Sequence, residues 1–379
     1  MRVLLIVTKG DLGGAQKRML DLATRLQEHD VEVTVGVGNS GDWLPAQLDE
    51  AGIPHDRFAY LSRSNPVHII AWWLELLRYL HKHSFDLVHF NSSSALSGVL
   101  PARLAGGVKT VFTFRGLSII SPNYPAVQPL KWLYGLAFQL FLPLLDVGVF
   151  QCKHDREVAA SRGLAPERSE VIRPGIDPEA VGYRDPEPAR QALMEQIDAD
   201  LHDRRVIGTI GRLSPQKHYP FLLEGFAEVA AHHDDAVLVI IGGGEQRTEL
   251  ERRARDLGIA DAVRFAGPVP DAARLMNAFD VFVLPSLYEG VSMTLTEAVH
   301  AGVPILASDA GGNRETVCDT DAALFPVNDL PAFTQALDRM LTDEEARREA
   351  VPGADCAETL LLRTSSRAYH RLYNEILAS

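Results

Sequence analysis

The feature that most constrains the fold is a repeated alternation of short apolar runs with amphipathic segments. Residues 3–7 (VLLIV) and 31–37 (VEVTVGV) flank residues 15–28, which have the periodicity of a helix. A near-continuous apolar run is typical of a parallel strand buried on both faces, so this stretch predicts a βαβ unit. Further strands are predicted at 85–90 and 108–114. The first half therefore predicts a mostly parallel sheet covered by helices.

The second half of the chain restarts the same pattern. Strands are predicted at 205–211 and 236–244, and three more follow. These three are VRFAG (263–267), DVFVLP (280–285) and VPILASD (303–309). At 379 residues the chain is long for one core, so two α/β domains are expected. The break is predicted near IRPGIDPEA (172–180), giving domains 1–173 and 174–365 with a last amphipathic helix in 366–379.

Charge and cysteine content exclude several classes of protein. The net charge is −13, of which residues 1–170 carry +1 and the remainder −14. Such an acidic surface makes a nucleic-acid partner unexpected, and an anionic ligand must be bound by a few placed groups. Three cysteines without CxxC spacing argue against a disulfide framework and for a reducing cytosol. The first apolar run is too short for a signal peptide, which also favours a cytoplasmic protein.

Histidines and acidic pairs give no metal site. The 13 histidines show no metal-ligand spacing, and His232-His233 is interpreted as a solvated helix end. Asp319-Thr320-Asp321 spells a D-x-D metal motif, but it stands in a loop before a predicted strand. Neither feature therefore predicts a metal site.

A glycine turn follows the first strand. Gly13 and Gly14 allow the backbone to approach a ligand, and the following helix N-terminus favours an anion. A tight βα turn without a ligand explains the same glycines, and both interpretations stay open. A dinucleotide oxidoreductase is not favoured, because GxGxxG is absent and no acidic residue follows the second strand.

Two cations follow the first strand of the second half. Arg212 and Lys217 stand in the strand-to-helix loop of GRLSPQKHYPFLL. An arginine fork and a lysine point charge at a strand's carboxyl end suit a diphosphate. The alternative is two solvated surface charges.

The strongest motif is PSLYEGVSMTLTEAVHAGVPILASDAGG (285–312). Glu289 and Glu297 stand eight residues apart around a predicted helix start, with Ser292 as N-cap and Gly302 as stop. Free N–H groups near Gly290 to Met293 form a binding edge, and Glu297 suits a diol such as ribose. Eight helical residues span about 12 Å, too far for the paired carboxylates of a glycosidase.

Taken together, these motifs resemble the retaining glycosyltransferase family 4, which has the GT-B fold. The resemblance extends to GGAQKRMLDLATRL (13–26), VHFNSS (88–93), VIRPGID (171–177) and IGGGEQ (241–246). It implies two Rossmann-like domains facing across a cleft, an N-terminal acceptor domain and a C-terminal nucleotide-sugar domain. It also implies that the last helix crosses back to the N-terminal domain, and that neither a metal nor a cofactor is needed.

The resemblance implies a role for each matching residue. Gly13 and Gly14 lie beside the donor phosphates, which Arg212 and Lys217 neutralise. Glu297 binds the ribose, and the segment from Gly267 to Val269 contacts the base. The remaining donor-binding set comprises Gly243, Glu289, Gly290, Val291, Ser292 and Met293, of which Glu289 and residues 290–293 hold the transferred sugar.

Three residues depart from the family pattern. Gln16 and His218 stand where relatives often have Glu and Gly. More importantly, Arg115 stands where many relatives have a histidine near the sugar, and arginine stays protonated at neutral pH. Arg115 therefore acts as a charge toward a donor phosphate, an acidic sugar or an acidic acceptor, or it pairs with a carboxylate and fixes its loop.

The resemblance predicts transfer of a sugar from a nucleotide-diphosphate sugar, with UDP favoured, to a glycan or lipid-linked acceptor. Bacterial surface polysaccharide or lipopolysaccharide synthesis is the expected setting. The alternatives are a sugar-nucleotide epimerase of the same fold and a non-catalytic binding protein. Apolar, aromatic-rich segments at 69–80 and 132–145 predict either ordinary helices or a peripheral membrane contact.

Overall fold

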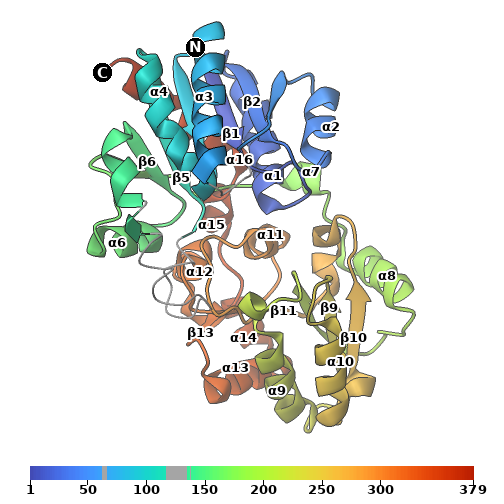
Figure 1. The fold of residues 1–379 in the computed structure, drawn as a ribbon. Helices are drawn as coiled ribbons and strands as arrows, with labels where there is room; N and C mark the ends of the chain where they lie inside the picture. The colour runs from blue at the N-terminus through green and yellow to red at the C-terminus, as the bar shows by residue number, and fades with distance from the viewer. Residues whose placement is uncertain (62–65, 117–134, 137) are drawn as a thin grey trace. The chain divides into compact units, whose positions relative to one another are not determined.

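The computed structural model describes residues 1–61, 66–116, 135–136 and 138–379 (Figure 1). Within these residues the chain forms two compact units. The first unit runs from the N-terminus to Gly175 and also includes Leu362–Ser379. The second unit is the continuous stretch Ile176–Leu361.

The first unit contains a parallel sheet in the order β3-β2-β1-β4-β5-β6-β7. Its strands are β1 (Arg2–Val7), β2 (Glu32–Gly38), β3 (His55–Phe58), β4 (Leu87–Phe90), β5 (Lys109–Phe114), β6 (Val147–Phe150) and β7 (Ser169–Val171). This order matches the doubly wound Rossmann arrangement, in which the strand order reverses between β1 and β4. Ligands of such sheets bind outside the carboxyl ends of the strands at that point.

Apolar side chains on both faces of this sheet form the core of the first unit. Leu4 and Ile6 of β1 belong to one buried cluster, whereas Val3 and Leu5 belong to the other. This alternation explains the continuous apolar run, because successive strand residues point to opposite faces. The covering helices are α1 (Gly14–Gln27), α2 (Trp43–Glu50), α3 (Pro66–Lys82), α4 (Val99–Ala105), α6 (Lys153–Ser161) and α16 (Leu362–Leu377).

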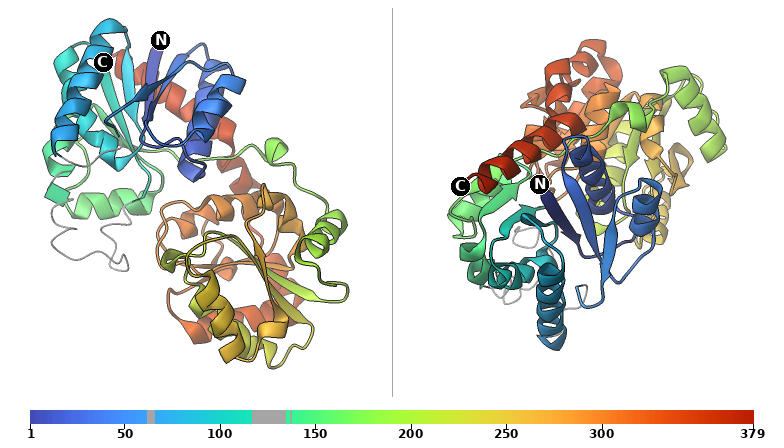
Figure 2. Two further views of the ribbon diagram at one scale, coloured as in Figure 1. Left: turned by 45° about the vertical axis from the view of Figure 1, so that its right-hand side comes forward. Right: turned by 90° about the horizontal axis from the view of Figure 1, so that it is seen from above.

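Helix α16, the last of the chain, belongs to the first unit (Figure 2). Tyr369, Leu372, Tyr373 and Ile376 form one stripe along it, and all four are buried against β1, β2 and α1 residues. The predicted return of the last helix to the N-terminal domain is therefore confirmed. The helix begins at Leu362, about one turn before the predicted start.

The second unit repeats the architecture with a parallel sheet in the order β10-β9-β8-β11-β12-β13. Its strands are β8 (Arg205–Ile210), β9 (Ala236–Ile241), β10 (Val263–Gly267), β11 (Val281–Leu284), β12 (Ile305–Ser308) and β13 (Leu324–Phe325). Side chains of β9 again belong to two buried clusters, with Val237 and Val239 on one face of the sheet and Leu238 and Ile240 on the other. The order reverses between β8 and β11, which is where a ligand is expected.

Helices cover both faces of the second sheet. They are α7 (Pro178–Val181), α8 (Pro186–Ile197), α9 (Tyr219–Ala230), α10 (Arg247–Asp256), α11 (Met293–Ala301), α12 (Asn313–Thr316), α13 (Leu330–Thr342), α14 (Glu344–Glu349) and α15 (Ala354–Thr359). The chain leaves and re-enters this unit at neighbouring points, since Ile176 and Leu361 form a parallel bridge. The α/β prediction with two sheets is confirmed.

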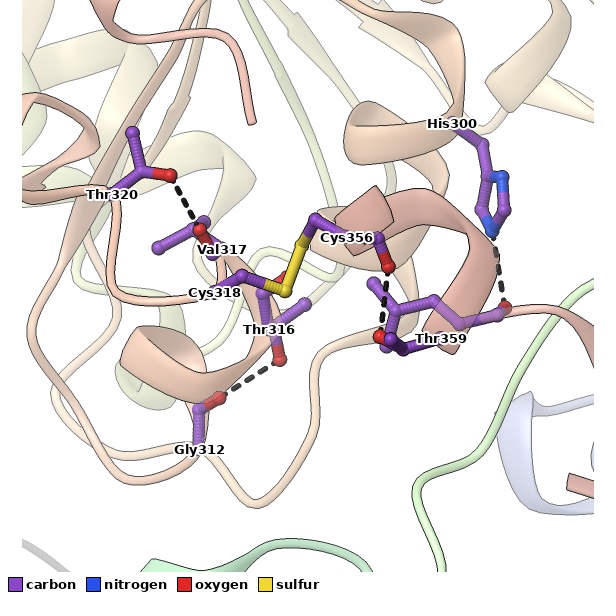
Figure 3. The surroundings of a disulfide bond; sticks show 9 residues. His300, Gly312, Thr316, Val317, Cys318, Thr320, Cys356 and Thr359 are labelled. Atoms are coloured by element: carbon purple, nitrogen blue, oxygen red, sulfur yellow. Dashed lines mark hydrogen bonds between the residues drawn. A yellow bond between two sulfur atoms is a disulfide. The ribbon is translucent and has the colours of Figure 1, made fainter. Parts of the chain in front are cut away.

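The cysteine prediction is wrong. Cys318 and Cys356 form a disulfide that joins the end of α12 to α15, and their Cα atoms are 5.8 Å apart (Figure 3). The two residues stand 38 positions apart in sequence, so only the tertiary fold brings them together. Cys152 is a buried free thiol. The cysteines therefore no longer argue for a reducing compartment.

The interpretation of His232-His233 is half wrong. His232 is exposed, but His233 is buried and its Nε2 lies 2.7 Å from Asp338 Oδ1 on α13. Asp321 is a surface residue that pairs with Arg314. The described residues contain no helix long and apolar enough to cross a membrane, and no group of three or more potential metal-ligating side chains.

Candidate functional site

The loops that follow β8, β9 and β10 contact one another through their backbones. The Gly211 N–H donates to the Ile241 oxygen, and the Gly242 N–H donates to the Gly267 oxygen at 2.8 Å. A Cβ atom at Gly242 would lie 1.9 Å from the Gly211 oxygen, so no side chain fits there. The glycine run after β9 thus lets the loop carrying Gly243 contact the loop carrying Arg212 and Lys217.

The segment after β11 forms the N-terminus of α11 as predicted. Ser292 is the N-cap and accepts a hydrogen bond from the Leu295 N–H, while Gly302 ends the helix in the left-handed conformation. The Gly290 oxygen accepts from the Gly312 N–H at 2.9 Å. A Cβ at Gly311 would lie 1.9 Å from the Glu289 oxygen, which explains the first glycine of the DAGG sequence. Val291 and Ser292 are buried, and Met293 is half-buried.

Lys217 and Glu289 form a buried ion pair across the point where the strand order reverses. Their Nζ and Oε1 atoms are 2.6 Å apart, and the two side chains are 13% and 7% exposed. Ser286 Oγ donates to the same carboxylate at 2.7 Å, and Gln216 Nε2 donates at 3.2 Å. The loops leaving β8 and β11 therefore hold a cation and an anion beside the α11 N-terminus, where a phosphate is favoured.

Arg212 occupies a different environment from Lys217. Its side chain is 75% exposed and lies 3.4 Å from Glu245, which is itself 55% exposed. Among the described residues no ion pair or hydrogen bond joins Arg212 to Lys217 or Glu289. A pair this exposed holds its partners weakly, so the guanidinium is free to turn toward a ligand.

Glu297 is half-buried one turn inside α11. Its main-chain oxygen accepts a hydrogen bond from the Tyr183 hydroxyl at 2.8 Å, and burial raises the pKa of Tyr183 well above its usual range. Val269, predicted to lie near the base, lines a groove of about 490 Å³ together with Arg184, Glu195, Asp271 and Arg274. Gly267, the start of that segment, has φ +74°.

In the first unit, the glycine turn precedes α1. Gly13 is the N-cap, and a Cβ there would lie 2.8 Å from Gln16 Oε1, whereas nothing lies within 4 Å of a Cβ at Gly14. Gln16 is buried and donates to the Lys9 oxygen at 3.1 Å. Gly14 therefore has open space beside it, which is compatible with the predicted approach of a ligand.

Arg115 follows β5 and makes no ion pair within the described residues. Its Nε donates to the Asn91 oxygen at 3.0 Å, and Nη2 donates to Asn91 Oδ1 at 3.2 Å. Gly116, the next residue, has φ +121°, a conformation that favours glycine. The alternative in which Arg115 pairs with a carboxylate receives no support from these contacts.

A buried polar chain lies next to Arg115. His89 of β4 contacts the Tyr373 hydroxyl at 2.6 Å through Nδ1 and Thr113 Oγ1 at 2.7 Å through Nε2. Thr113 in turn contacts the Tyr369 hydroxyl at 3.1 Å. Burial, together with the nearby Arg115 charge, lowers the pKa of His89 to about 3. The chain joins α16 to the centre of the first sheet.

Sequence reasoning missed several of these partners. Ser286, Gln216 and Tyr183 are neutral residues whose role depends on which loops meet in space. Asn91 stands inside the VHFNSS motif, which could have indicated it. The Lys217–Glu289 contact could have been expected, since both follow strands that neighbour each other in a 3-2-1-4 order.

The chain, with its two Rossmann-like units, has the fold of GT-B glycosyltransferases. HepE of Anabaena, solved with UDP and glucose, matches with a TM-score of 0.82 and 20% identity, covering 99% of this chain and 100% of that one. The sequence model of Glycosyltransferase Family 4 matches residues 12–180, and that of Glycosyl transferases group 1 matches residues 193–355.

Two relatives place the chain more closely. One is the UDP-Gal:alpha-D-GlcNAc-diphosphoundecaprenol alpha-1,3-galactosyltransferase of Escherichia coli, 30% identical over 72% of this chain and 70% of the relative. Another is the GDP-mannose-dependent alpha-(1-6)-phosphatidylinositol monomannoside mannosyltransferase of Mycolicibacterium smegmatis, 29% identical over 73% and 72%. The chain belongs to the group 1, family 4 glycosyltransferases.

Proposed function

We propose that this glycosyltransferase moves a sugar with retention from a nucleotide-diphosphate sugar, UDP-sugar foremost, to a glycan or lipid-linked acceptor. The observation that carries the proposal is the buried Lys217–Glu289 pair beside the N-terminus of α11. A leaving diphosphate gains negative charge as its bond to the sugar breaks. Fixed cations and helix N-terminal amides stabilise that charge without reorganising.

Each candidate site residue of the second unit then has a role in binding the donor. Arg212 and Lys217 neutralise the diphosphate, and Glu289 with residues 290–293 holds the hydroxyls of the transferred sugar. Glu297 binds the ribose, and Gly243 and the segment from Gly267 to Val269 border the nucleotide. In the first unit, Gly14 leaves room for the phosphates, and Gly13 stands before it as the N-cap of α1.

Retention follows from attack on the same face that the leaving group departs from. The acceptor oxygen forms a bond to the anomeric carbon, whose bond to the diphosphate oxygen breaks with both electrons remaining on that oxygen. The acceptor proton passes to the same phosphate oxygen. No carboxylate nucleophile is needed, and the positive charge that the step requires is supplied by Arg212 and Lys217 rather than by a metal or a cofactor.

The relatives guide the choice of substrates. The E. coli relative uses UDP-Gal and a diphosphoundecaprenol-linked sugar, and the mycobacterial relative uses GDP-mannose and a phosphatidylinositol mannoside. We favour UDP-sugars and a lipid-linked acceptor in bacterial surface polysaccharide or lipopolysaccharide synthesis. Family membership does not favour an epimerase or a non-catalytic binding protein.

The test is transfer by the purified protein in EDTA, using UDP-Gal, UDP-Glc, UDP-GlcNAc and GDP-mannose with a diphospholipid-linked sugar. We expect an α-linked product from an α-linked donor, identified by NMR of the anomeric proton. Glu289→Gln should abolish transfer, whereas Glu228→Gln, an exposed site on α9, should not. A β-linked product would contradict retention, and activity recovered only with Mg²⁺ would contradict metal independence. Conversion of the donor sugar without transfer would support the epimerase.

The acceptor's lipid requires a route to the membrane, and α3 offers a suitable face. Val67, Ile70 and Leu74 lie on one side of the helix and are 71%, 55% and 46% exposed. Arg78 and Lys82 continue the same line at four-residue steps. An exposed apolar stripe that ends in cations suits the interface of an anionic membrane.

The groove beside this stripe is lined by three cations (Arg57, Arg78 and Lys82) and two acids (Asp56 and Glu75), so its lining carries a net charge of +1. It measures about 500 Å³ and includes Arg78 and Lys82. Asp56 accepts from the Tyr79 hydroxyl, and Glu75 accepts from the Ala59 and Tyr60 N–H groups. These donors are neutral, so both carboxylates keep their charge and the lining retains its net charge of +1.

The second predicted segment, 132–145, is partly outside the described residues, at 132–134 and 137. In the described part, Leu136 and Leu140 are 48% and 69% exposed. Phe141 contacts Trp73 of α3 edge-to-face, with ring centroids 6.3 Å apart. The two segments thus lie side by side, which supports one membrane-contacting surface at the inner face of the bacterial membrane.

Flotation with vesicles of phosphatidylglycerol and phosphatidylcholine tests this surface. We expect the wild type to float at low salt and Ile70→Glu/Leu74→Glu to stay below. Leu257→Glu, an exposed site in the second unit, is the matched control and should float. A wild type that remains wholly in the soluble fraction would rule out the membrane contact.

A further inference from the structure

Gln216 joins the loop that follows β8 to the loop that follows β11. It is the middle residue of the short 3₁₀ helix Pro215–Lys217, and it is half-buried. The Leu287 N–H donates to the main-chain oxygen of Gln216 at 2.9 Å, and Gln216 Nε2 donates to the Tyr288 oxygen at 3.0 Å. The same nitrogen donates to Glu289 Oε2 at 3.2 Å. Gln216 therefore contacts three successive residues of the other loop.

The two partners of its side chain fix the orientation of the Gln216 amide. The Tyr288 oxygen and Glu289 Oε2 are both acceptors, so the NH₂ group faces them. A flipped amide would place its own oxygen against a carbonyl and a carboxylate. The amide has two N–H donors, one for each partner, and one of these partners belongs to the main chain. The side chain is thus anchored where it meets the carboxylate.

The Glu289 carboxylate is held through both of its oxygens. Oε1 accepts from Lys217 Nζ at 2.6 Å and from Ser286 Oγ at 2.7 Å, whereas Oε2 accepts from Gln216. The Glu289 side chain is 7% exposed, so little water can replace a lost donor. Gln216 therefore orients the carboxylate oxygen that Lys217 does not contact.

The proposed reaction asks two things of this cluster at once. Lys217 neutralises the donor diphosphate, while Glu289 holds the transferred sugar. An ammonium group is a point charge on a flexible stem, so an entering phosphate competes with the carboxylate for Lys217. The amide of Gln216 is neutral and also bound to a main-chain oxygen, so a phosphate competes for it much less. Gln216 can keep its contact with Glu289 while Lys217 turns to the phosphate.

We propose that Gln216 is a positioning residue, which keeps the Glu289 carboxylate oriented toward the transferred sugar when Lys217 engages the diphosphate. The proposal rests on the proposed transferase function. Gln216 acts through Glu289 and does not need to touch the substrate. Its loss should therefore lower kcat but leave the affinity for the nucleoside diphosphate unchanged, because that ligand lacks the sugar.

The first test is Gln216→Met, which removes both N–H donors at nearly the same side-chain length. Transfer is measured with the donor and acceptor that the wild type uses. A hydrogen bond to a buried carboxylate is lost, so kcat should fall about tenfold. Calorimetric titration of the nucleoside diphosphate of that donor should give the wild-type affinity.

The second test is the pH profile of Gln216→Glu. Burial and the neighbouring Glu289 charge raise the pKa of the introduced carboxyl group, because both disfavour its charged form. Above that pKa the group is an acceptor only and repels Glu289. Below it the group carries a proton that it can donate to Glu289. The kcat of Gln216→Glu relative to the wild type should therefore rise as the pH falls from about 8 to about 5.5.

Gln191→Glu is the matched control. Gln191 is exposed on α8, and its Nε2 donates to Glu195 Oε1 at 3.3 Å, so it is also a glutamine bonded to a glutamate. Because this pair lies outside the site, the variant should have the wild-type kcat. Its activity relative to the wild type should also stay constant across the pH range.

Three results would overturn the role of Gln216. They are a wild-type kcat in Gln216→Met, a loss of nucleotide affinity as large as the loss of kcat, and a relative kcat of Gln216→Glu that does not change with pH. If Gln216→Met fails to fold, Gln216→Asn gives the same comparison, because it keeps the amide but shortens its reach. A wild type that transfers no sugar would reject the proposed function and this role with it. Any of the three results in an enzyme that does transfer sugar rejects the role of Gln216 alone.

Discussion

At the scale of single residues, the two cations of the second unit are not equivalent. Lys217 is 13% exposed and paired with an almost buried carboxylate, whereas Arg212 is 75% exposed and pairs loosely with Glu245. Removing one partner of a buried pair leaves the other charge buried without compensation, whereas removing a surface arginine leaves its partner in contact with water.

We therefore expect Arg212→Ala to lower kcat about 10²–10³-fold with little change in stability. Lys217→Ala should lower kcat similarly and also the free energy of unfolding, by about 3 kcal/mol. Steady-state kinetics and urea unfolding measure the two effects. Arg252→Ala, which breaks an exposed pair with Asp256, should alter neither. Near-wild-type kcat in both Arg212→Ala and Lys217→Ala would show that the phosphate assignment is wrong.

His218 stands where relatives often have glycine, and its φ is +55°. The ring stacks on Phe221 at 5.2 Å, which helps to compensate for a backbone that costs a non-glycine residue about 1 kcal/mol. Both His218→Gly and His218→Ala lose the stack, but only alanine keeps the backbone penalty.

The glycine variant should therefore be about 1 kcal/mol more stable than the alanine variant, as measured by urea unfolding. At Glu228, on an exposed face of α9, the order should reverse, because glycine is the poorer helix former. Equal stability of the two His218 variants would mean that the left-handed backbone carries no cost.

At the scale of elements, His89 joins two strands to the last helix. It is buried among Thr113, Tyr369, Tyr373 and the Arg115 charge, and its pKa is lowered to about 3. An unfolded histidine titrates near 6.5, so below that pH the unfolded chain binds a proton that the folded chain does not. Stability contributed by His89 is thus fully present above pH 6.5 and is lost as the pH falls toward 3.

Between pH 7 and pH 5 this loss amounts to about 2 kcal/mol. Because other histidines also titrate, the quantity to measure is the difference in pH dependence between the wild type and His89→Gln. The variant should unfold with a shallower pH slope, and His232→Gln, at an exposed site, should keep the wild-type slope. Identical slopes for the wild type and His89→Gln would contradict a neutral buried His89.

The Cys318–Cys356 disulfide joins the end of α12 to α15 and links residues 38 positions apart in sequence. Closing a loop of that length stabilises a fold by up to about 4 kcal/mol. Without reductant, thiol labelling in denaturant should find one free thiol, Cys152, and three after reduction. Reduction should lower the midpoint of thermal unfolding, and Cys318→Ser should match the reduced wild type. Three labelled thiols before reduction would show that the bond is not formed.

At the scale of the whole molecule, periodicity predicted most strands to within a few residues. Strands β1, β2, β4, β5 and β8 to β12 all coincide with apolar runs, because parallel strands buried on both faces have little other choice of residues. β3 was not predicted, since HDRF at the sheet edge is polar. β6 follows almost directly on the long uncharged run 132–145, so the apolar pattern does not mark the residue at which this strand begins.

The candidate site was only partly predictable for a related reason. The N-cap Ser292 and the stop at Gly302 follow from local conformational preferences, and the structure confirms them. Contacts between distant loops, such as Lys217 with Glu289 or Cys318 with Cys356, depend on strand order and helix packing. The sequence pattern around each residue does not indicate which distant residues it will contact in the folded chain.

The division of the chain has a consequence for its synthesis. Leu362–Ser379 belong to the first unit, and Tyr373 and Ile376 are almost completely buried in its core. A ribosome completes all of Ile176–Leu361 before it makes that helix. We therefore expect the second unit to fold first during translation. Meanwhile the nascent N-terminal unit keeps the apolar surface of β1, β2 and α1 uncovered, so we expect chaperones to bind it until Leu362–Ser379 have emerged from the ribosome.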